Sequence, residues 1–352
     1  MTDLSHFSTL IIHLSAIQRN YALISRQLKS GRAGAVVKAN AYGLGAIQIA
    51  PVLYAAGCRD FFVATLEEAI EIRSLIADAA LYVFHGVRKG QNKDFTTHNL
   101  LPVLNSAEQI DLWNNAGPAA LHVDTGMCRL GVSLEELKSL KSKMQTPKLL
   151  MSHLACAGEP DHPKNKEQLT AFKVALQHFP GVPASLANSS GISLGADYHF
   201  DLTRPGRALY GITRGTTFPA DMENVVTLSA PVLQYRTLDA PQTVGYGASV
   251  TAPAGSVLAT VEMGYADGFR RSLSNKAHGY AGALRVPILG HVSMDMIVVD
   301  VTAVPAHLRT PDLRVTLIGK EQPIDVLAET AGTIGYEIFT GLGRRVKKIY
   351  ES

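Results

Sequence analysis

The chain has 352 residues, of which 46% are hydrophobic and 18% charged, and its formal net charge at pH 7 is +3. This length and composition are typical of a globular protein with one large domain, or a large and a smaller one, and they exclude an intrinsically disordered chain. The small positive charge is spread along the sequence without a basic block, so we do not expect nucleic acid as a partner.

No apolar stretch of the sequence is long enough to span a bilayer, and the first residues, MTDLSHFSTLIIHLS, lack the basic start and cleavage site of a signal peptide. We therefore expect a cytoplasmic protein with no membrane partner. Cys58, Cys128 and Cys156 are too few and too widely spaced for a disulfide framework, so they are interpreted as free thiols. The 12 histidines include no pair at ligand spacing beside a carboxylate, so no metal site is predicted.

Short β-rich runs alternate with amphipathic helical segments, such as residues 66–79 and 133–144, up to about residue 212. Parallel strands joined by helices form right-handed βαβ units. Eight such strands predict an α/β fold, a (β/α)8 barrel of TIM type. A doubly wound open sheet is the alternative, but its GxGxxG fingerprint is absent after the first strand. The predicted strands are residues 35–39, 61–65, 81–86, 100–105, 120–124, 149–156, 184–188 and 208–212.

After residue 217 the pattern changes to strands broken by Pro, Gly and Asp, with hardly a helix between them. This pattern predicts a second, smaller and mainly β domain. We therefore expect a barrel domain over residues 1–222 and a mainly β C-terminal domain over residues 223–352. The strands predicted in the second domain lie within residues 225–238, 255–264, 285–301 and 313–319.

Residues that carry chemistry follow the predicted strands, and in a barrel of this type the carboxyl ends of the strands meet at one mouth. Lys38 ends an apolar run, so burial can lower its pKa and let the neutral amine form a Schiff base with a carbonyl. The turns NSSG and RPG near the last two strands lie where this fold often binds phosphate. Together they indicate pyridoxal phosphate, although an exposed lysine near a turn is an alternative reading of Lys38. The residues brought to the mouth are Lys38, Asp124, Arg129, His153, Asn188, Ser189, Arg204 and Gly206.

The segment AVVKANAYGLG resembles the cofactor-lysine signature of the bacterial, pyridoxal-phosphate-dependent alanine racemases. Further blocks resemble that family in its order and spacing, so the similarity extends over nearly the whole chain. The resemblance implies an amino-acid racemase that interconverts L-alanine and D-alanine, supplies D-alanine for peptidoglycan, and works as a homodimer with shared active sites. These blocks are DTGMCRLG, SHLACAGEP, LANSSG, RPGRALYG, VGYGAS, GYADGFRR, GHVSMDM and GYEIFT.

The resemblance also implies roles for individual residues. Lys38 is linked covalently to pyridoxal phosphate and serves as one catalytic base, and Tyr265 is the second base. Arg129 binds the substrate carboxylate, and Tyr265 and Met294 reach the site from the other subunit. His153 packs beside the cofactor ring, and Arg204 faces the pyridine nitrogen. The residues expected around the cofactor are Lys38, Tyr42, His153, Asn188, Ser189, Arg204, Gly206, Arg207 and Tyr336.

Racemisation explains why these residue types are needed. A proton leaves one face of Cα and another arrives at the opposite face, so two acid-base groups must flank this carbon. Lysine and tyrosine have unperturbed pKa values of about 10, which burial or nearby cations must lower for work at neutral pH. Arg204 keeps its proton at ordinary pH, so we expect it to leave the pyridine nitrogen unprotonated and the cofactor a poorer electron sink.

Among the positions at which the sequence departs from the family, two bear directly on predicted site residues. His122 replaces a lysine that is often carbamylated in relatives and supports the substrate-binding arginine, and an imidazole cannot form that carbamate. Arg129 therefore needs another support. Arg207 stands where an apolar residue is usual, and its side chain either adds a cation to the phosphate site or points away.

Three alternatives fit parts of the pattern. A broad-specificity racemase acting on serine, lysine or arginine would keep the same chemistry. A non-catalytic protein of pyridoxal phosphate homeostasis has the same type of barrel, but such proteins lack the β domain and with it Tyr265. A decarboxylase with a related barrel-plus-β architecture fits less well, because its characteristic cysteine and glycine-rich phosphate loop are absent from the expected places.

Overall fold

The computed structural model describes residues 7–216, 218 and 222–352. Its residues group into two compact units, Ile17–Glu223 and the segment up to Ala16 together with Asn224–Ser352. The sequence placed the N-terminal segment with the barrel, whereas β1 (Thr9–His13) pairs with strands of the second unit. The short strand is grouped with the β unit because its backbone hydrogen bonds are made there.

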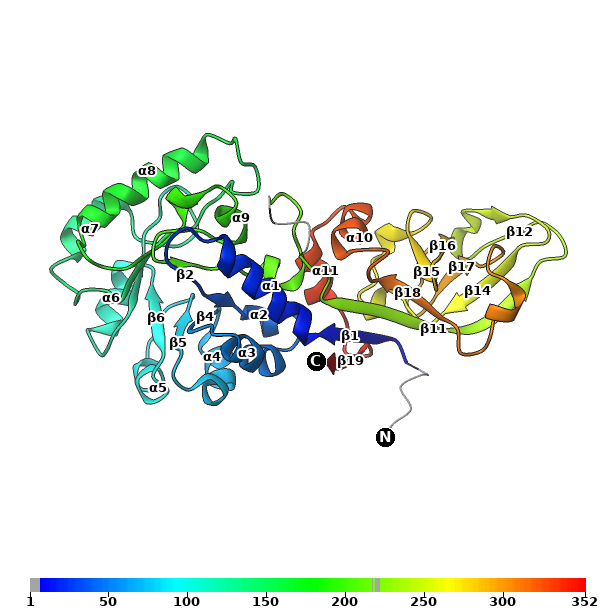
Figure 1. The fold of residues 1–352 in the computed structure, drawn as a ribbon, viewed down its shortest axis with the longest axis horizontal. Helices are drawn as coiled ribbons and strands as arrows, with labels where there is room; N and C mark the ends of the chain where they lie inside the picture. The colour runs from blue at the N-terminus through cyan, green and yellow to red at the C-terminus, as the bar shows by residue number, and fades with distance from the viewer. Residues whose placement is uncertain (1–6, 217, 219–221) are drawn as a thin grey trace. The chain divides into compact units, whose positions relative to one another are not determined.

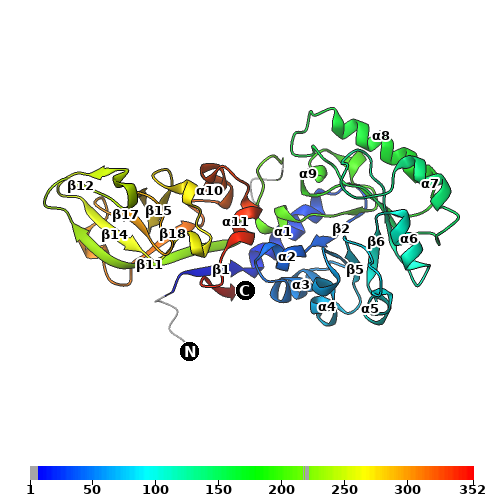
Figure 2. The same ribbon diagram turned by 180° about the vertical axis from the view of Figure 1, so that it is seen from behind.

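The first unit is built on a parallel sheet with the strand order β3-β4-β5-β6-β7-β8-β9. Consecutive strands are neighbours, as expected for right-handed βαβ units. Figure 1 shows helices on the outside of these strands, and Figure 2 shows the same arrangement from behind. The strands are β3 (Ala35–Val36), β4 (Asp60–Val63), β5 (Ala80–Val83), β6 (Leu101–Leu104), β7 (Ala120–His122), β8 (Leu149–Met151) and β9 (Ala184–Ser185).

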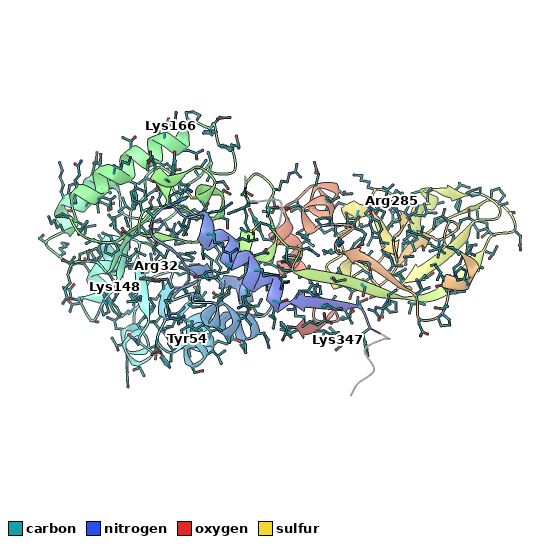
Figure 3. The ribbon with its side chains drawn as sticks, viewed as in Figure 1. Arg32, Tyr54, Lys148, Lys166, Arg285 and Lys347 are labelled. Atoms are coloured by element: carbon teal, nitrogen blue, oxygen red, sulfur yellow. The ribbon has the colours of Figure 1, made fainter. Side chains whose placement is uncertain are left out.

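Two further short strands, β2 (Arg32–Ala33) and β10 (Leu202–Thr203), close the sheet into a ring. Backbone bonds join β9 to β10 through Asp201 N to Ala184 O (3.1 Å), and β10 pairs in parallel with β2. Arg32 on β2, labelled in Figure 3, also donates two hydrogen bonds (2.6 and 3.0 Å) to the buried carboxylate of Asp60 on β4. These links confirm a TIM-like barrel in which β10 takes the eighth strand position.

The eighth strand predicted from the sequence, residues 208–212, is wrong. The segment Arg207–Tyr210 forms the 3-10 helix η4, and the strand at this position is β10, which is only two residues long. Ala208, Leu209 and Tyr210 are fully buried, and a short apolar run of this kind is equally compatible with a strand or with one buried helical turn.

Helices connect the strands of the barrel, and several begin at side-chain caps that the sequence signals. Thr65 and Glu68 form a reciprocal capping box at the start of α4 (Leu66–Arg73), and Ser133 and Glu136 do so at α7 (Leu134–Leu140). These two helices lie within predicted helical segments. The other helical elements are α1 (Leu14–Gln27), α2 (Lys38–Tyr42), α3 (Ala46–Ala55), η2 (Ser74–Ile76), α5 (Asn92–Thr97), α6 (Ala107–Trp113), α8 (Lys164–Gln177), α9 (Ser189–Ile192) and η3 (Ala196–Tyr198).

Large apolar side chains fill the barrel interior. Phe62 stacks on Tyr82 with 4.7 Å between ring centroids and lies 5.4 Å from Phe84, and all three come from or follow neighbouring strands. Aromatic pairs at these distances add about 0.5–1.5 kcal/mol beyond the burial of their area. The interior is therefore a packed core, and functional side chains are left to the ends of the strands.

The second unit is centred on a closed antiparallel barrel with the strand order β11-β14-β17-β16-β15-β18-β11. β1 pairs with β11 on one side and with β19 on the other. The strands are β11 (Val226–Thr237), β12 (Gln242–Thr243), β13 (Thr251–Ala252), β14 (Val257–Val261), β15 (His278–Ala281), β16 (Leu284–Leu289), β17 (Ile297–Asp300), β18 (Arg314–Ile318) and β19 (Lys347–Glu351).

The predicted strands of this unit are confirmed by β11, β14, β16, β17 and β18. Helices α10 (Ile324–Ala331) and α11 (Gly335–Gly341) were not expected from the sequence. The 3-10 helices are η5 (Tyr246–Ala248), η6 (Tyr265–Asp267), η7 (Arg271–Leu273) and η8 (Ala306–Leu308). Among the described residues, no helix is both long enough and apolar enough to cross a membrane.

Candidate active site

The predicted residues of the barrel unit gather where its strands end. Lys38 follows β3, His122 ends β7, His153 follows β8, and Arg204 directly follows β10. The carboxyl ends of parallel strands lie at one edge of the barrel. His153 is close enough to the other basic side chains for their charges to lower its pKa; these side chains are Arg204, Arg129, His122 and Lys38. The structure therefore brings together the basic side chains that the sequence singled out in this unit.

Lys38 is half-buried, and its Nζ lies 5.7 Å from the ring centroid of Phe84. Burial is the main reason that the pKa of Lys38 is lowered, and the positive charge of Arg129 lowers it further, against a smaller effect of Glu68. A lysine with a lowered pKa has a larger share of neutral amine near pH 7, which is the form that attacks carbonyl groups.

The backbone after Lys38 turns through left-handed helical geometry, with φ between 52° and 57° at Ala39, Asn40, Ala41 and Tyr42. Such geometry costs about 1–2 kcal/mol per non-glycine residue, so it must be held by its surroundings. Glu68 accepts hydrogen bonds from Ala39 N and Ala64 N, both at 2.7 Å. Glu68 thus ties the turn that follows Lys38 to the end of β4, a role that the sequence analysis missed although the capping-box motif marked this residue.

Arg204 is a fully buried guanidinium, and its hydrogen-bond partners among the described residues include no carboxylate. It donates to Ser185 Oγ and to the carbonyls of Ser152 and Leu186. Burial lowers the pKa of Arg204 to about 9, so it stays cationic at neutral pH. This charge is fixed at the mouth of the barrel and favours an anion or an electron-rich group there.

The imidazole of His122, which replaces the lysine that the family resemblance led us to expect, is held by a side-chain hydrogen bond. Its Nδ1 lies 2.8 Å from Asn105 Oδ1, and Asn105 Nδ2 donates to the carbonyls of Phe84 and Val103. Since Oδ1 is then the acceptor, His122 Nδ1 carries the proton and Nε2 keeps its lone pair. Burial, then Arg204, lower the pKa of His122 to about 4. A neutral imidazole therefore occupies this position at pH 7.

His153 is the second imidazole of the group. Burial lowers its pKa well below the usual value, and the charges of Arg204 and Arg129 act in the same direction. Gln168 Nε2 donates to the His153 carbonyl (2.9 Å), and Gln168 Oε1 accepts from Ala155 N (2.8 Å), which fixes the backbone of the segment that carries the ring. His153 is thus a neutral and positioned ring rather than a further cation.

The opposing turns after β9 and β10 are hydrogen-bonded to each other. Ser189 Oγ accepts from Gly206 N (2.9 Å) and Ala208 N (3.3 Å), and Asn188 caps α9 by accepting from Gly191 N (2.9 Å). Arg207 donates to Ser190 Oγ (2.8 Å) and to the carbonyl of Arg214. Its side chain therefore points towards α9 and the loop after η4. The sequence alone did not predict the direction of this side chain.

Gly206 packs closely against Tyr42. An added Cβ would lie 2.3 Å from the hydroxyl oxygen of Tyr42, so an alanine at this position would force the Tyr42 side chain to shift. We expect Gly206→Ala to lower the free energy of unfolding of this unit by about 1–3 kcal/mol. Urea denaturation measures this loss. In the Tyr42→Phe background the loss is expected to shrink, while Gly158→Ala, which meets no atom within 4 Å, serves as the control.

The depressed pKa of His122 predicts a pH dependence of stability. Between its folded pKa of about 4 and its ordinary value of 6.5, the unfolded chain binds a proton that the folded chain does not. The stabilisation, about 3 kcal/mol, is therefore present above pH 6.5 and is lost as the pH falls towards 4. In urea titrations across this range, His122→Gln is expected to lose stability less steeply than the unaltered chain. His85→Gln, at an exposed imidazole, should retain the original slope.

Three predicted residues, Tyr265, Met294 and Tyr336, belong to the β unit. Tyr265 and Met294 are 43% and 52% exposed, and their loops are joined by backbone bonds from Tyr265 N to Ser293 O and from Ala266 N to Met294 O, both 3.0 Å. Tyr336 is half-buried in the first turn of α11. The ion pair between Arg270 and Glu337 (2.8 Å) connects that helix to the segment after Tyr265.

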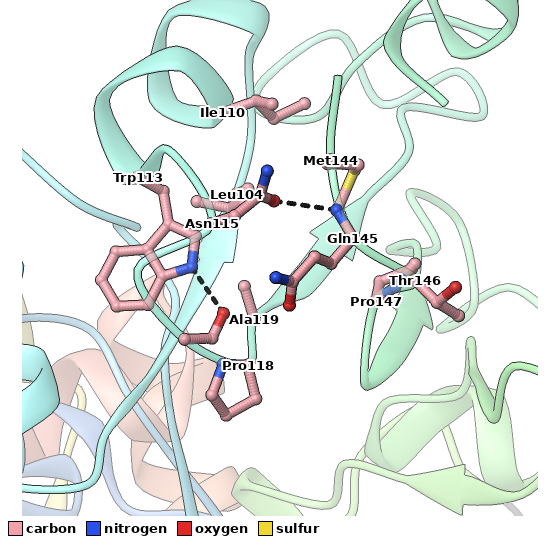
Figure 4. Close-up of a pocket in the computed structure, with 11 residues that line it drawn as sticks. Leu104, Ile110, Trp113, Asn115, Pro118, Ala119, Met144, Gln145, Thr146 and Pro147 are labelled. Atoms are coloured by element: carbon pink, nitrogen blue, oxygen red, sulfur yellow. Dashed lines mark hydrogen bonds between the residues drawn. The ribbon is translucent and has the colours of Figure 1, made fainter. Parts of the chain in front are cut away.

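A separate pocket of the barrel unit lacks comparable chemistry. The pocket in Figure 4 has an empty volume of about 290 Å³, and none of its lining residues is titratable. Its Trp113 Nε1 donates to Gly117 O (2.9 Å), and Asn115 Oδ1 accepts from Gln145 N (2.8 Å). In the part of the chain that the structure describes, no group of three or more His, Cys, Asp or Glu side chains is arranged to hold a metal ion.

Comparison with known proteins agrees with this arrangement. The family model of the alanine racemase N-terminal domain matches residues 12–214, and that of the alanine racemase C-terminal domain matches residues 225–350. The chain is 49% identical to an alanine racemase of Rhodospirillum rubrum, over 97% of this chain and 95% of that protein.

Solved structures show the same similarity. One is an alanine racemase from Bartonella henselae with covalently bound pyridoxal phosphate, at 40% identity and a TM-score of 0.90, covering 98% of this chain and 99% of that one. Another is the biosynthetic alanine racemase of Pseudomonas aeruginosa, at 32% identity and a TM-score of 0.90, covering 99% of this chain and all of the other. Both family models and these similarities along nearly the whole length show that the chain is a member of the alanine racemase family.

Proposed function

We propose that this chain is a pyridoxal-phosphate-dependent racemase that interconverts L-alanine and D-alanine, with Lys38 and Tyr265 as its two acid-base groups. The observation that carries the proposal is the position of Lys38, whose pKa is lowered among the cations at the mouth of a TIM-like barrel. The relatives named alanine racemase, at 49% identity in one case, support the substrate.

The residues at the mouth fit an anionic cofactor. Arg129 and Arg204 supply positive charge, and the turns at Ser189 and Gly206 are small and lie directly against the Tyr42 hydroxyl. Tyr42, Asn188, Ser189, Gly206, the Arg207 backbone and Tyr336 would hold the phosphate end, while His153 and Arg204 would face the ring. When bound through its aldehyde, pyridoxal phosphate makes the α-hydrogen of an amino acid acidic.

Within this site, each residue of the chain performs a simple task. The guanidinium of Arg129 binds the substrate carboxylate and so fixes the orientation of Cα. Lys38 Nζ takes or returns a proton on one face of Cα, and Tyr265 Oη does so on the other. The neutral His153 and the charged Arg204 hold their protonation states at neutral pH, which keeps the ring environment constant during the reaction.

The proposal includes a homodimer in which Tyr265 and Met294 are supplied by the second subunit. Both side chains are about half-exposed on the β unit, so each has surface available for another chain. We also propose a cytoplasmic enzyme whose D-alanine serves peptidoglycan synthesis, as the resemblance implies.

Chiral chromatography of L-alanine incubated with the purified protein and pyridoxal phosphate tests this function. We expect equal amounts of the two enantiomers at equilibrium, because mirror images have the same free energy in water. Parallel incubations with L-serine, L-lysine and L-arginine test the substrate. Comparable rates on these amino acids would show a broad-specificity racemase, and no turnover with cofactor bound would contradict the proposal.

A further inference from the structure

Two loops of the β unit carry the residues to which the proposed function assigns the second acid-base group and a substrate contact. One loop, residues 264–268, begins after β14 and contains Tyr265 in η6. The other, residues 293–296, lies between β16 and β17 and contains Met294. Since about half of each side chain is exposed, its own packing holds it only in part, and its position also depends on what holds its loop.

The side chain of Arg345 bridges these two loops. Its Nε donates to Asp267 Oδ1 and its guanidinium also donates to Asp295 Oδ1, each at 2.7 Å. Asp267 is two residues after Tyr265, and Asp295 directly follows Met294. Arg345 lies in the segment before β19, so one guanidinium connects three separate parts of this unit.

The contacts around Asp267 make this bridge specific. Asp267 is buried, its Oδ2 accepts from Gly264 N (2.9 Å), and its carbonyl accepts from Gly343 N (2.9 Å). At Gly264 an added Cβ would lie 2.1 Å from Met294 O, so the two loops touch through their backbones. A shift of the Asp267 carboxylate would therefore move the turn that carries Tyr265.

The charges in this region leave Asp267 dependent on Arg345. Glu262 lies nearby with its Oε2 buried and without a hydrogen-bond partner among the described residues, and burial together with Asp267 raises its pKa. Arg345 and Arg314 are the cations that oppose this raised pKa. Without Arg345, the buried Asp267 would lose its ion pair while remaining close to another carboxylate.

We infer that Arg345 is a positioning residue that holds the Tyr265 and Met294 loops in one geometry for racemisation. This inference rests on the proposed function. Arg345 itself touches neither reacting group, so its effect is exerted through Asp267 and Asp295. Arginine suits this task because its planar fork reaches two carboxylates at once, whereas a lysine ammonium is a single point charge.

The first test measures the loops directly and does not depend on activity. In amide hydrogen exchange followed by mass spectrometry, we expect Arg345→Gln to accelerate exchange in peptides covering residues 262–270 and 290–298 and to leave the barrel strands β4 to β8 unchanged. Arg344→Gln, at the exposed neighbouring arginine, is the matched control. Unchanged exchange of both loop peptides in Arg345→Gln would overturn the inference.

The second test measures the reaction. Arg345→Gln is expected to slow racemisation by about ten- to a hundredfold, the size expected for a misplacement of about 1 Å, with Arg345→Lys in between. In D2O, exchange of the α-hydrogen should fall for the enantiomer that faces Tyr265 and persist for the one that faces Lys38. A merely structural defect would slow both exchanges equally, and this outcome would contradict a positioning role.

Asp295→Asn provides a milder variant, because Asp295 is half-exposed and its loss leaves the pair between Arg345 and Asp267 in place. We expect the same asymmetry of α-hydrogen exchange, smaller in size. If the unaltered chain did not racemise alanine, the proposed function would fail while the hydrogen-exchange test of the loops would still decide the role of Arg345. If it racemised alanine and Arg345→Gln behaved as Arg344→Gln does, the inference alone would fail.

Discussion

Lys38→Ala is expected to abolish racemisation, with a loss of about a thousandfold or more, because the same amine links the cofactor and moves a proton. The residue lies directly after the first barrel strand, where burial and Arg129 lower its pKa. Alanine removes the nucleophilic amine, and because it is smaller than lysine it introduces no steric clash. Chiral chromatography of the products measures the loss.

The covalent link provides a second readout for the same variant. Borohydride reduces a Schiff base to a stable secondary amine, so the unaltered protein should carry the reduced cofactor on the peptide that contains Lys38, and Lys38→Ala should carry none. Lys173→Ala, at an exposed lysine on α8, controls for the loss of a lysine elsewhere. Partial recovery of turnover by added methylamine would attribute the loss to the missing amine. Full activity of Lys38→Ala would overturn its assignment.

The parallel barrel and most β-unit strands could be predicted because their patterns are local. Runs of apolar residues alternate with amphipathic helices before residue 212, and apolar runs broken by Pro, Gly and Asp follow after residue 217. The eighth barrel strand could not be found this way. β10 has only two residues, and the buried run beside it forms η4, so length and hydrophobicity favoured the wrong segment.

The membership of β1 in the second unit was also out of reach of the sequence. No strand was predicted at Thr9–His13, and the pairing of this segment with β11 and β19 joins residues more than 200 positions apart. No local pattern encodes which sheet a short strand joins, because the choice depends on which edge has free backbone groups.

The residues of the candidate site also fall into those that the sequence could predict and those that it could not. Residues such as Lys38 and Arg204 could be predicted because they follow strands and match family blocks. Their supporting side chains could not, since Asn105 lies 17 positions from His122 and Arg345 lies 78 positions from Asp267. Contacts at such separations have no characteristic spacing. Glu68 was not predicted either, although its capping-box motif with Thr65 is local and could have marked the residue, though not its bond with Ala39.

Tyr265→Phe is expected to slow racemisation by about 10²- to 10⁴-fold, the usual contribution of a positioned acid-base group. The change removes one hydroxyl from a side chain that is 43% exposed, so little packing is lost and the fold should be unaffected. Because the two products are mirror images, the equilibrium constant is unity. The values of kcat/KM in the two directions must therefore fall together, and steady-state rates alone cannot tell which base is missing.

Exchange of the α-hydrogen in D2O separates the two bases. Lys38 retains its amine in Tyr265→Phe, and an ammonium with three protons exchanges an abstracted hydrogen with solvent. We therefore expect one enantiomer to exchange its α-hydrogen without racemising, while the other enantiomer exchanges slowly. Tyr235→Phe, which removes a hydroxyl that donates to Thr310 O (2.9 Å) on the same unit, should leave both exchanges and racemisation unchanged. A base that lies on one face of Cα affects the exchange of only one enantiomer. Equal slowing of both exchanges in Tyr265→Phe would therefore contradict this role and indicate a role in substrate binding.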